Sequence, residues 1–372
     1  MRIGFDAKRA FLNTTGLGNY SRYAINGLAR MYPENSYHLY TPTADGDPDY
    51  TPPEGAEIIQ PASPWARSLK SYWRSYGITK RLSRDGMDIY HGLSNEIPYG
   101  IEKSGVPGIV TIHDLIFLKL PELYRSMDRR IYLSKSKYAV QAAERIIAIS
   151  EQTKNDLVEL LDADEKKIRV IYQGCNPWFM EKPEPEKLAE IRKKYKLPKQ
   201  YLLYVGTIEE RKNLFEIIKA VHTFNIDIPV VAVGRKTAYA MQIEEYIAEH
   251  GIKNIHFYQH IDNRDLPGLY RQAEAFVYPS RYEGFGIPVL EALNSGIPVI
   301  TSKGGCLEET AGEGGLKVTP GDTEELGHAI KRILEDSALR SSLVTAGAVH
   351  ARMFREEVTI PALYNVYKEC IR

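Results

Sequence analysis

The sequence predicts an α/β protein of two domains, each an open parallel sheet covered by helices. Short apolar runs alternate with helical patterns along most of the chain, as expected for parallel strands joined by crossover helices. The series of runs is long enough for two sheets, and 372 residues exceed the roughly 150 of one typical domain. Three prolines, Pro177, Pro183 and Pro185, and then a charged helical pattern that runs to residue 200 separate the two series.

Each predicted strand is a short run rich in β-branched and aromatic residues that ends in a turn signal. In the first half these runs are RIGFDA (2–7), YHLYTP (37–42), DIYHGL (88–93), GIVTIHD (108–114), RIIAIS (145–150) and IRVIYQG (168–174). In the second half they are YLLYVG (201–206), IPVVAVG (228–234), NIHFYQHI (254–261), AFVYPS (275–280) and IPVITS (297–302). Helical patterns such as 19–32, 134–146 and 214–224 lie between them.

The domain boundaries follow from the proline-rich break. We expect an N-terminal domain at 1–178 and a C-terminal domain at 179–355. The tail, 356–372, is a helical pattern interrupted at Pro361, and it can pack on either domain, the N-terminal one included. Ligands of open parallel sheets bind outside the carboxyl ends of the strands, so the loops after strands are the places to search for a site.

The composition excludes several classes of protein. The net charge is zero, with 48 basic and 48 acidic residues, which argues against a nucleic-acid partner. The three cysteines are far apart and odd in number, as in a protein of a reducing compartment. No apolar run reaches the roughly 18 residues of a membrane span, and the N-terminus has no apolar signal core. We therefore expect a cytoplasmic protein.

The stretch RYEGFGIPVLEALNSG (281–296) carries the clearest chemical signal. It follows a predicted buried strand and continues into a helix, whose first-turn N–H groups and the backbone of Gly284, Phe285 and Gly286 suit a phosphate. Glu283 and Glu291 would repel phosphate, but a carboxylate can accept two hydrogen bonds from a sugar diol. Taken alone, each glutamate is equally compatible with a solvated surface position. Together they suggest a phosphate flanked by two polyols, as in a nucleotide sugar.

These residues resemble the E-x7-E signature of retaining glycosyltransferases of the GT-B fold, especially glycosyltransferase family 4. Three further segments resemble family landmarks in the same order, so the resemblance covers nearly the whole chain. They are TGLGNY (15–20), TIHDL (111–115) and GTIEERKN (206–213). The resemblance implies two Rossmann-like doubly wound domains that face each other across a cleft, with the acceptor on the N-terminal domain and the nucleotide sugar on the C-terminal one.

The resemblance also assigns roles to single residues. Arg211 and Lys212 would hold the diphosphate and stabilise the leaving group, although many relatives carry an arginine where this chain has Thr207. His113 would lie near the donor sugar and the acceptor and bond to a sugar hydroxyl, and Asp114 would orient its ring. Closure of the domains around the linker near 176–187 would exclude water.

Gly16 and Gly18 also suggest a dinucleotide fingerprint, but Ser21 stands where the third glycine should be, and the preceding strand ends too early. We expect instead that this glycine loop approaches an acceptor or a phosphate.

No cofactor and no metal site are expected. Asp45 and Asp47 have the D-x-D spacing of a metal site, but they lie in a segment rich in proline, glycine and threonine, which is typical of a solvated turn. His256 and His260 lie in a predicted strand, where a spacing of four does not place them on a shared helix face.

The segment 65–84 contains six basic residues, no acidic one, and interleaved aromatic residues. Such a helix suits an anionic membrane surface or a lipid-phosphate acceptor, and it suits equally an exposed helix whose aromatic residues pack inward.

The resulting hypothesis is a metal-independent, retaining hexosyltransferase of surface polysaccharide synthesis. Glu291 would bind the ribose and Glu283 the sugar, the donor would be GDP-mannose in the first place, and the acceptor a glycan or a lipid-linked glycan. A UDP-sugar donor, a non-catalytic nucleotide-sugar binding protein and an epimerase-type enzyme are the alternatives. A phosphorylase of this fold would be far longer, and a nicotinamide dehydrogenase is disfavoured by the broken glycine fingerprint. The sequence leaves the donor base, acceptor, linkage and oligomeric state open.

Overall fold

The computed structural model describes residues 1–46, 50–63 and 68–371. The chain divides into two compact units, one of residues 1–174 with 354–372 and the other of residues 175–353. These divisions fall close to the expected breaks after residues 178 and 355. Within the described residues, one unit holds a seven-stranded sheet and the other a six-stranded sheet, and all paired strands are parallel. The predicted α/β class is therefore confirmed.

The first unit has the strand order β3-β2-β1-β4-β5-β6-β7. Its strands are β1 (Arg2–Asp6), β2 (Ser36–Tyr40), β3 (Glu57–Ile59), β4 (Ile89–Gly92), β5 (Gly108–Ile112), β6 (Arg145–Ala148) and β7 (Ile168–Val170). Its helices are α1 (Lys8–Leu12), α2 (Gly16–Met31), α4 (Lys70–Tyr72), α5 (Ile78–Arg84), α6 (Ile116–Lys119), α7 (Ser126–Ala142), α8 (Glu151–Leu161) and α17 (Glu356–Cys370). Every residue of β5 is buried, as expected for a strand covered on both faces.

The second unit has the strand order β10-β9-β8-β11-β12-β13. Its strands are β8 (Leu202–Val205), β9 (Val230–Val233), β10 (Ile255–Tyr258), β11 (Ala275–Tyr278), β12 (Val299–Ser302) and β13 (Gly315–Val318). Its helices are α9 (Pro185–Tyr195), α10 (Leu214–Thr223), α11 (Ala240–Glu249), α12 (Leu266–Arg271), α13 (Ile287–Asn294), α14 (Gly305–Ala311), α15 (Thr323–Glu335) and α16 (Ser337–His350). The central strands β8 and β11 reverse the strand order, which is where ligands of such sheets bind.

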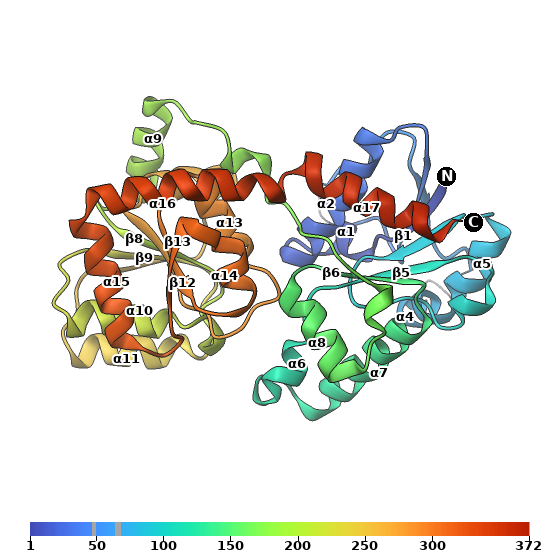
Figure 1. Ribbon diagram of the computed structural model, residues 1–372, viewed down its shortest axis with the longest axis horizontal. Coiled ribbons are helices and arrows are strands. Elements are labelled where there is room, and N and C mark those ends of the chain that lie inside the picture. Colours follow the sequence, from blue (N-terminus) through green and yellow to red (C-terminus); the bar gives the residue numbers. More distant parts are fainter. Residues whose placement is uncertain (47–49, 64–67, 372) are drawn as a thin grey trace. The chain divides into compact units, whose positions relative to one another are not determined.

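The C-terminal helix α17 belongs to the first unit, although the chain reaches it from the second. It runs unbroken through Pro361 and packs against α2 (Figure 1). The rings of Tyr32 and Tyr364 stack with centroids 3.7 Å apart, and the hydroxyls of Tyr23 and Thr359 are hydrogen-bonded.

Candidate functional site

The loops after β8 and β11 are neighbours because the two strands pair in parallel, with Phe276 opposite Leu203. A turn ending at Asn213 follows β8, and the segment 279–286 follows β11. The Asn213 side chain fixes one loop to the other, since its Nδ2 donates to the Pro279 carbonyl at 3.2 Å. Asn213 has a φ of 61°, a conformation that asparagine tolerates better than most residues. The two loops therefore form one surface at the carboxyl edge of the sheet.

The predicted phosphate-binding cations meet a predicted glutamate on this surface. Arg211 Nη1 lies 2.7 Å from one oxygen of Glu283, and Lys212 Nζ lies 3.7 Å from the other. Arg211 Nη2 also pairs with Glu209 at 2.6 Å. The side chains of Arg211, Glu283 and Lys212 are only 11%, 13% and 17% exposed, so these charges interact with little solvent screening. Three residues named from the sequence thus come together.

Tyr278, the last residue of β11, bridges two of these charges. Its hydroxyl accepts a hydrogen bond from Lys212 Nζ at 2.8 Å and donates one to Glu283 Oε1 at 2.8 Å. Ser280 Oγ donates to the same glutamate oxygen at 3.0 Å. Burial by itself would raise the pKa of Glu283, but Lys212, Arg211 and the Tyr278 hydrogen bond outweigh it and lower the pKa to about 2. Glu283 is therefore a carboxylate at neutral pH.

Glu291 lies in α13, eight residues further along, in a different environment. Its Oε2 accepts a hydrogen bond from Tyr270 Oη at 2.9 Å, and Tyr270 itself is buried. Burial raises the pKa of Glu291 to about 8, and the hydrogen bond from Tyr270 offsets only part of that rise. Glu291 therefore carries a proton at neutral pH in this structure, and can donate a hydrogen bond as well as accept one.

The segment Gly284, Phe285 and Gly286 is buried, and Phe285 is part of the core. Gly286 has a φ of 128°, and a side chain there would approach Leu307 to 2.8 Å, so only glycine fits. At the start of α13, the N–H groups of Val289 and Leu290 both donate to the Gly286 carbonyl, and Pro288 has no N–H. The first turn of this helix therefore offers fewer donors to a phosphate than the sequence pattern suggested.

In the first unit, His113 follows β5 and is buried. Its Nε2 donates to the Leu93 carbonyl at 2.9 Å, and the Tyr20 ring lies edge-on with centroids 4.6 Å apart. Burial lowers the pKa of His113 to about 4, and the charge of Arg9 adds to that effect, so the ring is neutral at neutral pH. Asp114 Oδ1 accepts from the Ile116 N–H at 3.1 Å. The His113 ring thus contacts the Leu93 carbonyl and the Tyr20 ring.

The two predicted loop glycines lie inside the first turn of α2, which begins at Gly16. Gly18 is packed against the backbone, since a Cβ there would lie 1.7 Å from the Asn13 carbonyl oxygen, and its N–H donates to Asn13 Oδ1 at 3.2 Å. Gly18 therefore serves the close packing of α2 on the end of α1, while Gly16 has open space around it.

Of the basic segment 65–84, residues 65–67 lie outside the described residues, as does Asp47 of the predicted solvated turn. In the rest of the segment Trp73 is buried in the core, and Arg74 is buried between Asp6 and Glu96, at 2.6 and 2.9 Å. Tyr72 and Tyr76 are half exposed. The segment is therefore partly an outward surface and partly core.

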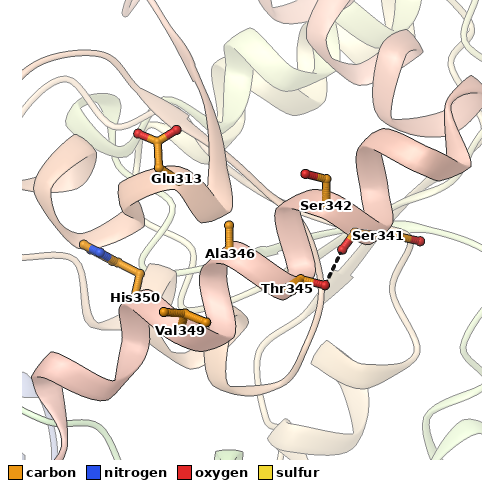
Figure 2. Close-up of a pocket in the computed structure, with 7 residues that line it drawn as sticks. All are labelled: Glu313, Ser341, Ser342, Thr345, Ala346, Val349 and His350. Carbon is orange, nitrogen blue, oxygen red and sulfur yellow. Dashed lines mark hydrogen bonds between the residues drawn. The ribbon is translucent and has the colours of Figure 1, made fainter.

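A cavity of about 680 Å³ lies elsewhere in the second unit, on α16. Figure 2 shows its lining of small and polar residues, Glu313, Ser341, Ser342, Thr345, Ala346, Val349 and His350. None of the residues named from the sequence lines it. Within the described residues, no cluster of three or more histidine, cysteine, aspartate or glutamate side chains is arranged to hold a metal. In that same part of the chain, no helix combines the length and apolar character that crossing a bilayer requires.

Three contributors to the site were not predicted, namely Tyr278, Ser280 and Tyr270. Tyr278 closes a predicted buried strand, and the sequence pattern assigned it no role at the site. Its position directly before a loop with a predicted glutamate is the signal that marks it, because the last strand residue projects beside the loop.

Two family models match the chain. "Glycosyltransferase Family 4" matches residues 14–179, and "Glycosyl transferases group 1" matches residues 187–350. The O-antigen chain mannosyltransferase B of Escherichia coli is 30% identical over 294 residues, which is 77% of this chain and 75% of that protein. The O-antigen chain mannosyltransferase RfbU of Salmonella typhimurium is 30% identical over 227 residues, 60% of each protein.

A solved structure of similar fold is the sucrose-phosphate synthase of Thermosynechococcus elongatus. It superposes with a TM-score of 0.78 at 23% identity, and the match covers 99% of this chain and 98% of that one. At this level of identity the likeness concerns the fold alone. It extends to both units, each of which has a counterpart in that structure.

Proposed function

The chain belongs to glycosyltransferase family 4, and from that premise we propose that it moves a hexose from a nucleotide diphosphate sugar to an acceptor hydroxyl, with retention at the anomeric carbon. Mannose from GDP-mannose is the favoured donor, because the two relatives named above are mannosyltransferases. Both are O-antigen enzymes, which favours a glycan or lipid-linked glycan as the acceptor and surface polysaccharide synthesis as the process.

The observation that carries the proposal is the group of Arg211, Lys212 and Glu283 at the carboxyl edge of the second sheet. A departing diphosphate gains negative charge as the glycosidic bond breaks, and two fixed cations in a poorly solvated site stabilise that charge without reorganising. Glu283 and Tyr278 hold the cations in place before the donor binds. Fixed cations in this position can replace a divalent metal, so we propose metal-independent transfer.

The transfer itself would proceed on one face of the sugar. The acceptor oxygen forms a bond to the anomeric carbon as the bond from that carbon to the diphosphate oxygen breaks, and the acceptor proton passes to the departing diphosphate. No separate base is required, in keeping with His113, which is neutral and engaged with Leu93. Glu291, protonated and on α13, would bind a ribose hydroxyl, and Glu283 would bind the transferred sugar.

Two further parts of the proposal concern the donor base and the membrane. A UDP-sugar is the alternative donor, because no contact described above distinguishes guanine from uracil. Contact with an anionic membrane surface through 65–84 is supported by the half-exposed Tyr72 and Tyr76, and would suit a cytoplasmic enzyme with a lipid-linked acceptor. A non-catalytic nucleotide-sugar binding protein and an epimerase-type enzyme remain as outcomes of the test below.

The test is a thermal-shift panel of GDP, UDP, their common sugar conjugates and NAD, with and without EDTA, followed by acceptor-dependent release of the nucleotide diphosphate. A ligand at 100 times its dissociation constant adds about 2.7 kcal/mol to the free energy of unfolding. We expect a shift with one nucleotide that survives EDTA, and loss of that shift in Arg211→Gln. The matched control is Arg281→Gln, since Arg281 lies in the same pair of loops but is half exposed.

Each alternative predicts a different result in this panel. A shift without turnover on any acceptor would identify a binding protein, and conversion of the nucleotide sugar without an acceptor would identify an epimerase. A shift only with NAD, or only with added divalent metal, would overturn the proposal. The anomeric configuration of the product, read by NMR, tests retention directly.

A further inference from the structure

The first unit also brings charged residues together at the carboxyl edge of its sheet. Strands β1, β4 and β5 are neighbours, with Phe5 opposite His91 and His91 opposite Ile109. The residues that follow these strands therefore lie along one edge of the sheet. They are Lys8 and Arg9 after β1, Ser94 and Glu96 after β4, and His113 after β5.

Two carboxylates at this edge, Asp6 and Glu96, are already paired. Asp6 is bound by the buried Arg74, whose Nε donates to it at 2.7 Å. Glu96 accepts from Arg74 Nη1 and from Lys135 Nζ, both at 2.9 Å. In the part of the chain that the structure describes, Lys8 Nζ makes no hydrogen bond and no ion pair. Arg74 and Lys135 thus take up these two carboxylates, and in the described part of the chain neither Lys8 nor Arg9 makes an ion pair; the Asp114 carboxylate also lies at this edge and accepts from the Ile116 N–H.

The surroundings of Lys8 and Arg9 add to the excess of positive charge at this edge. Burial lowers the pKa of Lys8, the charges of Arg74 and Arg9 lower it further, and the nearby carboxylates of Asp6 and Glu96 offset only part of that effect. Arg9 is close enough to His113 that its charge also lowers the pKa of that ring. Two buried polar atoms, Arg9 Nε and Ser94 Oγ, have no hydrogen-bond partner among the described residues. Such unsatisfied groups are rare in folded proteins and indicate a missing polar partner.

We propose that Lys8 and Arg9, with Ser94 at the same edge of the sheet, bind an anionic group of the acceptor, namely a phosphate. The inference rests on the proposed function, because it takes this edge of the first unit as the acceptor side. A phosphate would supply the counter-charge that the two cations lack, and its oxygens would accept from Arg9 Nε and Ser94 Oγ. An isoprenoid-linked phosphate and a sugar phosphate carry the same group, and the experiment separates them.

The experiment measures binding of three probes to the full chain by thermal-shift titration: inorganic phosphate, glucose 1-phosphate and farnesyl phosphate. Saturating GDP or UDP is present to occupy the proposed donor cations in the second unit. The test variant is Lys8→Gln with Arg9→Gln. The control is Lys103→Gln with Lys166→Gln, which removes the same charge from two exposed positions of the first unit.

We expect inorganic phosphate to bind the test variant about tenfold or more weakly than the wild type, the change expected when a charge-assisted hydrogen bond is lost. The control should bind like the wild type, and the single variant Arg9→Lys should retain part of the affinity. The nucleotide shift should be unchanged in every variant. Tighter binding of farnesyl phosphate than of inorganic phosphate would identify a lipid-linked acceptor, and tighter binding of glucose 1-phosphate a sugar phosphate.

Equal phosphate binding by the wild type and the test variant would overturn the inference, as would no binding by the wild type. Loss of the nucleotide shift in the test variant would also overturn it, because the pair would then serve the donor diphosphate. If the test variant fails to fold, the single variants Arg9→Lys and Arg9→Gln are measured instead. Phosphate affinity equal to that of the wild type in both would contradict the proposal. A wild type that binds phosphate but no nucleotide would refute the proposed function and leave this site standing.

Discussion

Glu283 and Glu291 are eight residues apart and differ in protonation: at neutral pH Glu283 is a carboxylate, and Glu291 is a neutral carboxyl group. Glu283 lies in the loop after β11 between two cations and two hydroxyls, and its pKa is lowered to about 2. Glu291 lies on α13, where a tyrosine hydroxyl but no cation is paired with it among the described residues, and its pKa is raised to about 8. Both are partly buried, so the difference comes from the partners and not from the degree of burial.

The two glutamates of the signature therefore lie in chemically different surroundings. The region of Glu283 is an ionic cluster that fixes two cations, the ones that the proposed function assigns to a diphosphate. The region of Glu291 is a neutral hydrogen-bonding site, in which a carboxyl group can donate to one sugar oxygen and accept from another. Four substitutions test this division, and their expected effects decrease in order.

Arg211→Gln should have the largest effect. It removes the main partner of a carboxylate with little solvent around it, and breaking such a pair lowers the free energy of unfolding by about 3 kcal/mol. The rate of transfer should fall about a hundredfold or more, as for loss of a donor that stabilises a leaving group. Urea denaturation and initial rates measure both. Arg281→Gln, which removes an exposed arginine of the same loops, should change neither, and equal effects of the two would show that Arg211 is merely a surface charge.

Tyr278→Phe should have the second largest effect, about 2 kcal/mol, since it removes a hydroxyl bonded to two charged groups. The folded-state pKa of Glu283 is lower than the unfolded one, so its charge stabilises the fold above about pH 4.5 and that stabilisation is lost as the pH falls toward 2. The Tyr278 hydrogen bond helps to lower this pKa, so the variant should unfold at a higher pH. Acid titration followed by circular dichroism measures the shift, and an unchanged midpoint would contradict the bridging role.

Much of this site was predictable, because strand-and-loop patterns are local. Glu283 was named from its loop after a predicted strand, and Arg211 and Lys212 were named from the family resemblance of the segment after another strand; parallel pairing of β8 with β11 brings the three together. The position of the strands is encoded in short apolar runs, and strand order then follows a few topological rules.

The charge states were not predictable, since they depend on contacts distant in the sequence. The proton on Glu291 depends on burial beside Tyr270, which belongs to α12. Gly18 was predicted to line a ligand loop, but the structure places it in α2 against the Asn13 carbonyl. Asn13 and Gly18 are close in sequence, yet the contact appears only when the turn between α1 and α2 is known.

Glu291→Gln tests whether Glu291 is protonated. It should have a smaller effect on the free energy of unfolding, and that effect should depend on pH. The folded-state pKa of Glu291 is higher than the unfolded value of 4.5, so between pH 4.5 and about 8 the folded state binds more protons. The free energy of unfolding of the wild type should therefore fall as the pH rises through this window. Glutamine resembles the protonated carboxyl group, so the variant should lose this part of the pH dependence.

Melting temperatures of both proteins between about pH 5 and about pH 9 measure the difference. The control is Glu324→Gln, because Glu324 is exposed on α15 and should leave the pH dependence of the wild type intact. A Glu291→Gln variant that keeps the pH dependence of the wild type would show that Glu291 is ionised throughout.

Tyr270→Phe should have the smallest effect, and it is the matched counterpart of Tyr278→Phe. Each substitution removes one hydroxyl that donates to a glutamate, at 2.9 Å for Tyr270 and 2.8 Å for Tyr278. A hydrogen bond to a neutral carboxyl group contributes about 1 kcal/mol, roughly half the value for a bond to a charged one. Near pH 6, Tyr270→Phe should therefore cost less stability than Tyr278→Phe. Above about pH 8 the cost should grow, because Glu291 then becomes charged and loses its donor. If the two variants cost the same near pH 6, Glu291 is already a carboxylate there, and the division between an ionic and a neutral half of the site is wrong.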